Sequence, residues 1–372
     1  MLIGVPKEIK NHEYRVGLTP ASVQEFKAHG HDIIVESLAG AGIGASDDDY
    51  RAAGAAVVDS AEEVFARAEM VVKVKEPQAA ERGMLRADQL LFTYLHLAPD
   101  PEQTRDLVTS GATCIAYETV GDGQGGLPLL APMSQVAGRL SIQAGAHCLE
   151  KAHAGRGILL GGVPGVAPAA VTVIGGGVVG EHAIQMALGM GADVTVLDRD
   201  VEVLNRLSRQ YGTALKTLYS TRASLESSVL ASDLVVGAVL VKGAAAPKLV
   251  TREMLSRMRP GSVLVDVAID QGGCFETSKA TTHADPYYVV DGVVHYCVAN
   301  MPGAVPYTST HALNNATLPY ALMLADKGYQ QALSESPEFM AGLNVYQGKV
   351  TCEAVARDLD YDYHDPRVLI AA

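Results

Sequence analysis

The sequence predicts an α/β protein of two domains, each built around a doubly wound parallel sheet. The chain has 372 residues, which is more than a single hydrophobic core usually supports. Short apolar runs alternate with helical segments along it, as in parallel sheets whose strands are connected by helices. Because these runs show no polar alternation, we expect helices to cover both faces of each sheet.

The first part of the chain contains the elements of one such domain. Thr19 is suited to the N-cap of the first helix, Pro20 to its first turn and Gly30 to its C-terminal end. Apolar runs typical of strands occur before and after this helix, at residues 2–5, 32–36, 55–58, 70–74, 90–94 and 113–116.

The second predicted domain contains another set of strands, and the chain passes between the two domains at two crossing points. The glycine- and proline-rich stretch 121–132 is a crossing point, and a helix is expected from about Ser134 to His153. A second crossing is expected near Pro302 and Pro306, before a helix from Tyr307 toward Tyr329, after which the tail rejoins the first domain. The second set of strands is expected at residues 171–174, 193–197, 233–239 and 262–269. The predicted domains are residues 1–130 plus 306–372, and residues 131–305.

The composition excludes several classes of protein. Apolar residues make up 48% of the chain and charged residues 19%, which excludes a disordered or fibrous protein. The net charge is −13 and no basic block occurs, so nucleic acid is not an expected partner. The N-terminus lacks the features of a signal peptide, and the uncharged stretch 157–180 contains too many glycines for a membrane span. Five cysteines without a CxxC pair or a compact zinc-site spacing predict reduced thiols, a cytoplasmic location and no metal site.

The strongest motif is VTVIGGGVVGEHA, in which Gly175, Gly177 and Gly180 follow a strand-like run and open a helix. Glycines at this spacing allow a tight turn and a close approach of the backbone to a pyrophosphate. Asp198 ends the next strand-like run, 18 residues after Gly180, where a carboxylate accepts hydrogen bonds from ribose hydroxyls. The alternative is a glycine turn needed only for packing. The combination predicts Rossmann-like domains and a dinucleotide site that favours NAD over NADP, although the adjacent Arg199 weakens the latter preference.

Four ionisable residues are candidates for substrate chemistry. Ligands of open α/β sheets bind at the carboxyl ends of the strands, and Arg15, Lys75, His96 and Asp270 all follow strand-like runs. Three come from the first domain and Asp270 from the second, so a substrate in a cleft between the domains is expected to contact all four. Each has a structural alternative: Arg15 as an ion-pair partner of Glu13 or Glu8, Lys75 and His96 as exposed strand-end residues, and Asp270 as a turn cap.

The whole chain resembles the bacterial alanine dehydrogenase family, which also includes the NAD-binding subunit of proton-translocating transhydrogenase. The resemblance rests on long motifs: GVPKEIKNHEYRVGLTP, VKVKEP, YLHLA, MSQVAGR, GGVPGVAPAAVTVIGGGVVG, DVAIDQGG, TTHADP and HYCVANMPGAVPYTSTHALNNATLPY. It implies that residues 1–130 plus 306–372 form the substrate and catalytic domain and that residues 131–305 bind NAD. It also implies a homohexamer.

The resemblance further assigns roles to individual positions. Arg15 and Lys75 match residues that hold the substrate, His96 matches the catalytic acid/base, and Asp270 matches a second active-site residue. The family often has a basic residue where this chain has Val203, so one contact near the adenosine is expected to be absent. Cofactor contacts beyond Gly175, Gly177 and Gly180 are implied for Ser134, Val178, Val179, Asp198, Ser220, Val239, Leu240, Val267, Ala268, Ile269, Asp270, Lys279, Val298, Ala299, Asn300 and Met301.

The implied reaction is the reversible, NAD-dependent oxidative deamination of L-alanine to pyruvate and ammonium. Two alternatives remain at this point: a transhydrogenase subunit that passes hydride to another protein, and a non-catalytic NAD-binding protein. The presence of all four ionisable residues favours the amino-acid enzyme.

Overall fold

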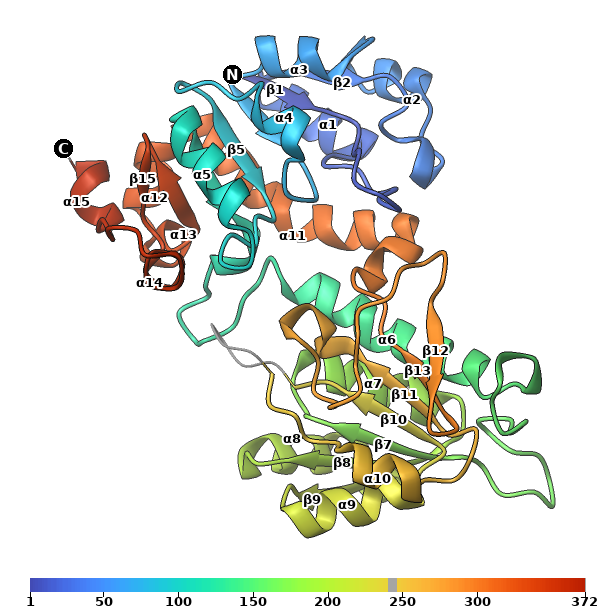
Figure 1. Ribbon diagram of the computed structural model, residues 1–372. Helices are drawn as coiled ribbons and strands as arrows, with labels where there is room; N and C mark the ends of the chain where they lie inside the picture. Colours follow the sequence, from blue (N-terminus) through green and yellow to red (C-terminus); the bar gives the residue numbers. More distant parts are fainter. Residues whose placement is uncertain (240–245, 372) are drawn as a thin grey trace. The chain divides into compact units, whose positions relative to one another are not determined.

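The computed structural model describes residues 1–239 and 246–371, which form two compact α/β units. The first unit consists of Met1–Met133 and Val305–Ala372, and the second of Ser134–Ala304. In Figure 1 the blue N-terminal and the red C-terminal segments therefore belong to the same unit, while the yellow segments and the orange strands β12 and β13 belong to the other. Each unit contains one sheet with helices packed against it.

The sheet of the first unit has the strand order β15-β14-β6-β5-β4-β1-β2-β3. From β3 to β6 all neighbours are parallel, whereas β14 runs antiparallel to β6 and brings the C-terminal tail back to this sheet. The order reverses between β1 and β4, which makes their carboxyl ends the place where ligands of such sheets bind. The strands are β1 (Leu2–Val5), β2 (Asp32–Glu36), β3 (Ala56–Val58), β4 (Met70–Val72), β5 (Leu90–Thr93), β6 (Thr113–Ala116), β14 (Leu343–Tyr346) and β15 (Lys349–Val350).

The first helix of this unit begins as predicted. The Thr19 side chain accepts a hydrogen bond from the Ser22 N–H, Pro20 occupies the first turn, and Gly30 follows the helix with φ +84°. Local sequence signals were sufficient here because capping depends only on neighbouring residues. The helices of the unit are α1 (Pro20–Ala28), α2 (Asp47–Ala52), α3 (Ala61–Arg67), α4 (Ala79–Arg82), α5 (Pro101–Ser110), α11 (Pro306–Lys327), α12 (Tyr329–Ser334), α13 (Pro337–Met340), α14 (Glu353–Leu359) and α15 (Pro366–Ala371).

The sheet of the second unit has the order β12-β13-β11-β10-β7-β8-β9. All neighbours are parallel except the edge strand β12, which is antiparallel to β13. The order reverses between β7 and β10, as it does between β1 and β4 in the first unit. The strands are β7 (Ala170–Ile174), β8 (Asp193–Asp198), β9 (Leu215–Tyr219), β10 (Leu234–Gly237), β11 (Val263–Asp266), β12 (Tyr287–Val290) and β13 (Val293–Tyr296).

Three predicted elements of the second unit end earlier than expected, and one of them is the strand predicted at 233–239, which ends at Gly237. The helix expected to reach His153 is α6 (Ala131–Cys148), because the chain turns into a short 3-10 helix at Lys151–His153 and reverses at Ala154 with φ +64°. The strand expected at 262–269 ends at Asp266, whose side chain accepts the Ala268 N–H and starts a 3-10 turn, Val267–Gln271. The other helices are α7 (Val178–Gly189), α8 (Val201–Tyr211), α9 (Arg222–Ala231) and α10 (Arg252–Arg257).

Among the described residues, no helix has the length and apolar character that crossing a bilayer requires.

Candidate active site

Arg15 lies in the segment that connects β1 to α1, and it is buried with 2% of its surface exposed. Its guanidinium pairs with Glu13 through two bonds, Nε to Oε1 at 2.6 Å and Nη2 to Oε2 at 2.5 Å. Nη1 approaches the Met133 sulfur at 2.9 Å. Burial opposes the charged form, but Glu13 outweighs it and the pKa of Arg15 lies above its ordinary value. The expected ion pair with Glu13 therefore exists, but in the interior, where it fixes the orientation of the guanidinium.

The segment around Arg15 is held in place by α11. The Asn314 side chain accepts the Thr19 N–H at 2.8 Å and donates to the Gly17 carbonyl at 3.1 Å, and Thr310 accepts the Val16 N–H. At Gly17 an added Cβ would lie 2.4 Å from the Val72 carbonyl oxygen. The segment after β1 therefore packs directly on the end of β4, and only glycine fits at this contact.

A buried ion cluster fixes the other side of this crossing point. The Glu8 carboxylate accepts the Val74 N–H at 2.7 Å and the Lys75 N–H at 3.2 Å, and its second oxygen contacts Lys73 Nζ at 2.9 Å. Lys73 is fully buried and also contacts Glu81 at 2.7 Å. Burial raises the pKa of Glu8 despite Lys73, and the two carboxylates keep the pKa of Lys73 raised despite its burial. The cluster orders the backbone from which the Lys75 side chain extends.

The Lys75 ammonium lies beside another acidic residue. Its Nζ is 3.2 Å from Glu76 Oε2, and the side chain is 14% exposed. Burial alone would raise the pKa of Glu76, but Lys75 and Lys10 outweigh burial and lower it to about 2. Lys75 is therefore a partly accessible cation that follows β4. Its ammonium pairs with the Glu76 carboxylate, and its backbone N–H donates to Glu8.

His96 follows β5 and has the unusual φ of +51°. The Glu118 carboxylate accepts the backbone N–H groups of Leu95 at 3.2 Å and of His96 at 2.6 Å, and its Oε1 lies 3.8 Å from His96 Nδ1. The imidazole is stacked on Tyr94, with ring centroids 5.7 Å apart and planes 7° apart. With 42% of its side chain exposed, His96 is oriented by its neighbours and remains open to a ligand.

The structure thus places Arg15, Lys75 and His96 at the carboxyl ends of the neighbouring strands β1, β4 and β5. Burial raises the pKa of Tyr94, and the positive charge of Arg15 opposes this shift. The guanidinium therefore interacts electrostatically with the residue whose ring stacks on His96. A sheet edge with two cations and one imidazole can bind a small carboxylate and exchange a proton with it.

The glycine loop of the second unit has the form expected for a dinucleotide site. Gly175 has φ +100°, and a Cβ at Gly180 would lie 1.8 Å from the Gly175 carbonyl oxygen, so side chains are excluded at both positions. Gly177 begins α7 without a side-chain cap, and a Cβ there would meet open space. Val178, in the first turn, is 44% exposed. An open, uncapped N-terminus of a twelve-residue helix fits a pyrophosphate.

Asp198 binds this loop directly. Its Oδ2 accepts the Gly176 N–H at 2.6 Å and its Oδ1 accepts the Asp200 N–H at 2.9 Å. Val203 packs against Gly176, and Arg206, one turn later on α8, donates to the Gly176 carbonyl at 3.1 Å. A basic residue of α8 therefore reaches the loop from a position other than Val203, a contact that the sequence did not indicate.

The remaining candidate cofactor residues also follow strands of this sheet, or lie at the start of α6 in the case of Ser134. Asp270 is exposed on the 3-10 turn after β11. This turn is anchored by the buried Asp266, which also accepts the Ser278 hydroxyl at 2.5 Å and the Cys274 N–H at 2.9 Å. Leu240 lies outside the described residues. The others are Ser220 after β9, Val239 after β10, Val267, Ala268 and Ile269 after β11, and Val298, Ala299, Asn300 and Met301 after β13.

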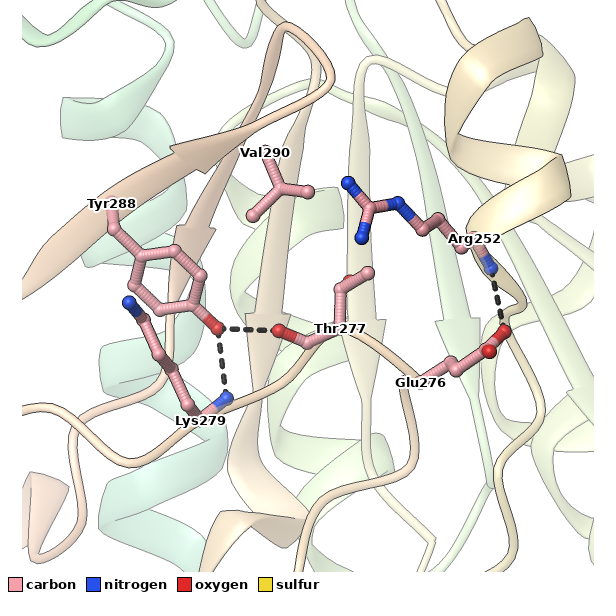
Figure 2. A pocket seen from close by; sticks show the side chains of 6 residues that line it. All are labelled: Arg252, Glu276, Thr277, Lys279, Tyr288 and Val290. Atoms are coloured by element: carbon pink, nitrogen blue, oxygen red, sulfur yellow. Dashed lines mark hydrogen bonds between the residues drawn. The ribbon is translucent and has the colours of Figure 1, made fainter.

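Lys279 is part of a separate small pocket of about 240 Å³ at the edge strand β12 (Figure 2). Its ammonium lies 4.5 Å from the centre of the Tyr288 ring, and its backbone N–H donates to the Tyr288 hydroxyl at 2.8 Å. Tyr288 donates in turn to the Thr277 carbonyl, and Glu276 accepts the Arg252 N–H at 2.8 Å. In sheet order β12 is four strands from β7, so this pocket is distinct from the glycine loop.

Sequence reasoning missed the charged residues that support the candidate site. Lys73 and Asp266 each interrupt an otherwise apolar strand run, and both are fully buried. A charge inside a buried strand needs partners, and this is the signal that could have identified them. Glu8 and Glu118 carry no comparable signal, because their roles depend on tertiary contacts.

Comparisons with known proteins agree with these observations. Residues 4–137 match the family model "Alanine dehydrogenase/PNT, N-terminal domain" and residues 141–353 match "Alanine dehydrogenase/PNT, C-terminal domain". This chain belongs to that family. The alanine dehydrogenase of Halomonas elongata is 63% identical over 370 residues, covering 100% of both chains. That of Bacillus subtilis is 54% identical over 364 residues, covering 98% of this chain and 96% of its own.

Solved structures of the alanine dehydrogenase/PNT family have the same fold. An L-alanine dehydrogenase superposes with a TM-score of 0.94 and 53% identity, covering 97% of this chain and 99% of that one. A transhydrogenase from Sinorhizobium meliloti superposes with a TM-score of 0.80 and 25% identity, covering 95% and 100%. Membership of the family implies a nicotinamide cofactor, and the open glycine loop fits one.

Proposed function

We propose that this chain is an NAD-dependent amino-acid dehydrogenase that converts L-alanine and water reversibly to pyruvate and ammonium. The observation that carries the proposal is the arrangement of Arg15, Lys75 and His96 on three neighbouring strand ends. High identity over the full length to proteins named alanine dehydrogenase supports the choice of substrate.

NAD is the proposed cofactor, held by the glycine loop after β7 and by the residues that follow the other strands of that sheet. Asp198 supports NAD over NADP because a carboxylate accepts hydrogen bonds from ribose hydroxyls and repels a 2′-phosphate. Arg199 is exposed at the surface. When bound, the nicotinamide accepts the hydride from the α-carbon of the substrate.

Arg15 and Lys75 are proposed to hold the substrate carboxylate, and Lys75 to polarise the carbonyl oxygen of pyruvate in the reverse reaction. Glu13 orients the Arg15 guanidinium, and the Glu8 carboxylate orders the Lys75 backbone. Neither cation requires a covalent bond to the substrate, since a positioned charge already stabilises negative charge that develops on oxygen.

His96 is proposed as the acid/base. Alanine first loses one ammonium proton, and loss of hydride then leaves an iminium, to which water adds. The resulting carbinolamine, protonated on nitrogen, expels ammonia when its hydroxyl proton is removed, and the ammonia takes up a proton to become ammonium. His96 takes the hydroxyl proton, and Asp270 is proposed to position the amine or water and to stabilise the cationic intermediates. The net reaction forms one reduced cofactor and one proton for each alanine oxidised.

A cytoplasmic homohexamer is the proposed state of the protein. All five cysteines are free, and four of them are buried, as expected for a reducing compartment.

Sedimentation at working concentration tests the oligomer: we expect a hexamer, and a stable monomer would contradict the proposal.

The decisive assay mixes the purified protein with L-alanine and NAD and follows the absorbance of the reduced cofactor. We expect reduction that requires both compounds and the release of pyruvate in equal amount. A protein that binds NAD but reduces none with L-alanine would support a non-catalytic role. Hydride transfer only to a second nicotinamide-binding protein would support a transhydrogenase role.

A further inference from the structure

A separate cluster of ligating side chains lies at the C-terminal end of α6. His147 belongs to the last turn of the helix, Glu150 follows it, and His153 lies in the 3-10 turn Lys151–His153. Gly138, nearer the start of the same helix, packs on the Val179 carbonyl of the glycine-loop helix. The cluster begins nine residues further along, roughly 13 Å at the helical rise, and it contains none of the residues assigned above.

The three side chains already converge. His147 Nδ1 lies 3.4 Å from Glu150 Oε1, and His153 Nε2 lies 3.9 Å from Glu150 Oε2. One ligand atom from each residue lies within 4.8 Å of the others, and the two imidazole rings are 3.8 Å apart at their centres. Nitrogen and oxygen ligands lie about 2.0–2.2 Å from Zn²⁺, so tetrahedral ligands are roughly 3.3 Å from one another. Only a small adjustment would bring the three atoms to this spacing.

His153 has the environment of a metal-binding histidine. Its Nδ1 is 3.1 Å from the Tyr287 hydroxyl, and the tyrosine ring packs edge-on against the imidazole. A hydrogen bond at one ring nitrogen fixes the orientation of the ring and directs the other nitrogen to its ligand. Here the other nitrogen, Nε2, is the one that faces Glu150.

Backbone hydrogen bonds define the conformation of the turn that carries these residues. The Glu150 carbonyl accepts the N–H groups of both His153 and Gly155, and the Leu149 carbonyl accepts the Gly157 N–H at 2.8 Å. A Cβ at Gly155 would lie 2.2 Å from the Cys148 carbonyl oxygen. The chain therefore holds the backbone that carries the three ligands in place, which lowers the part of the ordering cost of binding that comes from the backbone.

We propose that His147, Glu150 and His153 form a binding site for one divalent transition-metal ion of the Zn²⁺ type. Two imidazoles and one carboxylate suit Zn²⁺, Ni²⁺ or Co²⁺, whereas Mg²⁺ and Ca²⁺ prefer oxygen ligands alone. Because His147 and Glu150 are each 59% exposed, the remaining coordination positions are open to water. The sequence signal is His-x₂-Glu-x₂-His across a helix end, and the proposal differs from the expectation of no metal site. This site is independent of the proposed dehydrogenase function.

The test is equilibrium binding of Zn²⁺ to the full-length protein by titration calorimetry. We compare the wild type with the double variant His147→Ala/His153→Ala and with His364→Ala, a control that removes a histidine from the other unit. The wild type and the control are expected to bind one equivalent more than the double variant. Tyr287→Phe, which keeps the ring and removes the hydroxyl, is expected to weaken that binding by about tenfold.

Two further measurements test whether the site prefers Zn²⁺ to Mg²⁺ and whether bound Zn²⁺ stabilises the protein. Mg²⁺ in about hundredfold excess should leave the bound Zn²⁺ in place, and Zn²⁺ should raise the melting temperature of the wild type but not that of the double variant. Without metal the two proteins should melt alike, which shows that the double variant is folded. Equal Zn²⁺ binding by the wild type and the double variant, or no stoichiometric binding by the wild type, would overturn the proposal.

Discussion

The Glu118 carboxylate accepts the backbone N–H of His96 at 2.6 Å and so holds this residue at a φ of +51°. A positive φ is unfavourable for a residue with a Cβ and persists only where the surroundings impose it. The same carboxylate accepts the Leu95 N–H. Glu118 thus determines the backbone conformation from which the proposed acid/base extends, although it need not contact the substrate.

Removing this carboxylate is expected to reduce both stability and activity. Glu118→Ala leaves two backbone N–H groups without their acceptor, so we expect a loss of about 1–3 kcal/mol in the free energy of unfolding. We also expect kcat to fall by about tenfold or more as His96 loses its orientation. Glu118→Gln is the matched control, because its amide oxygen still accepts hydrogen bonds. If kcat per folded molecule is unchanged in Glu118→Ala, Glu118 does not position His96.

Arg15→Lys separates charge from geometry. The variant keeps a cation but loses the two-bond pairing with Glu13 that orients the guanidinium, so we expect KM for L-alanine to rise by at least about tenfold while the Kd for NAD is unchanged. Direct titration with NAD checks the second part. Arg67→Lys, at an exposed ion pair of α3, is the control and should alter neither value. Equal loss of both affinities in Arg15→Lys would show that Arg15 is structural.

Asp198→Asn tests how the cofactor is chosen. The amide retains one oxygen for the Gly176 N–H but loses the charge that repels a 2′-phosphate, so the ratio of kcat/KM for NAD to that for NADP should fall by about tenfold or more. Asp193→Asn, at the exposed start of the same strand, should leave this ratio unchanged. Because Asp198 also holds the glycine loop, melting temperatures are measured alongside. An unchanged ratio would show that Asp198 does not contact the ribose.

The ion pairs of Glu76 predict a pH dependence of stability. Its pKa is about 2 in the folded protein against 4.5 as the reference value, mainly because Lys75 and Lys10 outweigh its burial. The unfolded state binds the proton more readily, so the stabilisation is present above pH 4.5 and is lost as the pH falls toward 2. We expect up to about 3 kcal/mol from this group. The free energy of unfolding of Glu76→Gln, measured with denaturant between pH 7 and pH 3, should fall less on acidification than that of the wild type. Glu62→Gln, at an exposed position, is the control. If the free energy of unfolding falls equally with pH in the wild type, Glu76→Gln and Glu62→Gln, the prediction is contradicted.

Parts of the fold that depend on local signals could be predicted from the sequence. Most parallel strands of both sheets were recognisable because they form short, mainly buried apolar runs, and α1 and the glycine loop carry their own capping and turn residues. Five strands escaped recognition. Side chains of β9 and β12 are partly or largely exposed and give no continuous apolar run. The buried strands β13 and β14 are only four residues long and each contains a polar residue, His295 and Asn344, and β15 has only two residues. Tertiary contacts were equally invisible: nothing near Lys73 in the sequence shows that Glu8 and Glu81 neutralise it.

For the site, the rule that ligands bind at strand ends selected Arg15, Lys75, His96 and Asp270. In the structure the first three follow β1, β4 and β5, and Asp270 lies on the 3-10 turn after β11. The rule could not show that Arg15 is buried against Glu13 or that His96 has a positive φ. Both facts depend on residues brought together by folding. The contact from Arg206 to Gly176 was missed for the same reason, since a helix register is needed to see it.

The most direct test of the account compares the rate at which L-alanine reduces NAD in the wild type and in His96→Ala. We expect alanine-dependent reduction by the wild type and a kcat reduced by about a hundredfold or more in His96→Ala, with the Kd for NAD unchanged. Asp270→Asn is expected to behave in the same way. A His96→Ala protein that oxidises L-alanine at nearly the wild-type rate would contradict the assignment of His96, and a wild type that cannot reduce NAD with L-alanine would contradict the proposed function itself.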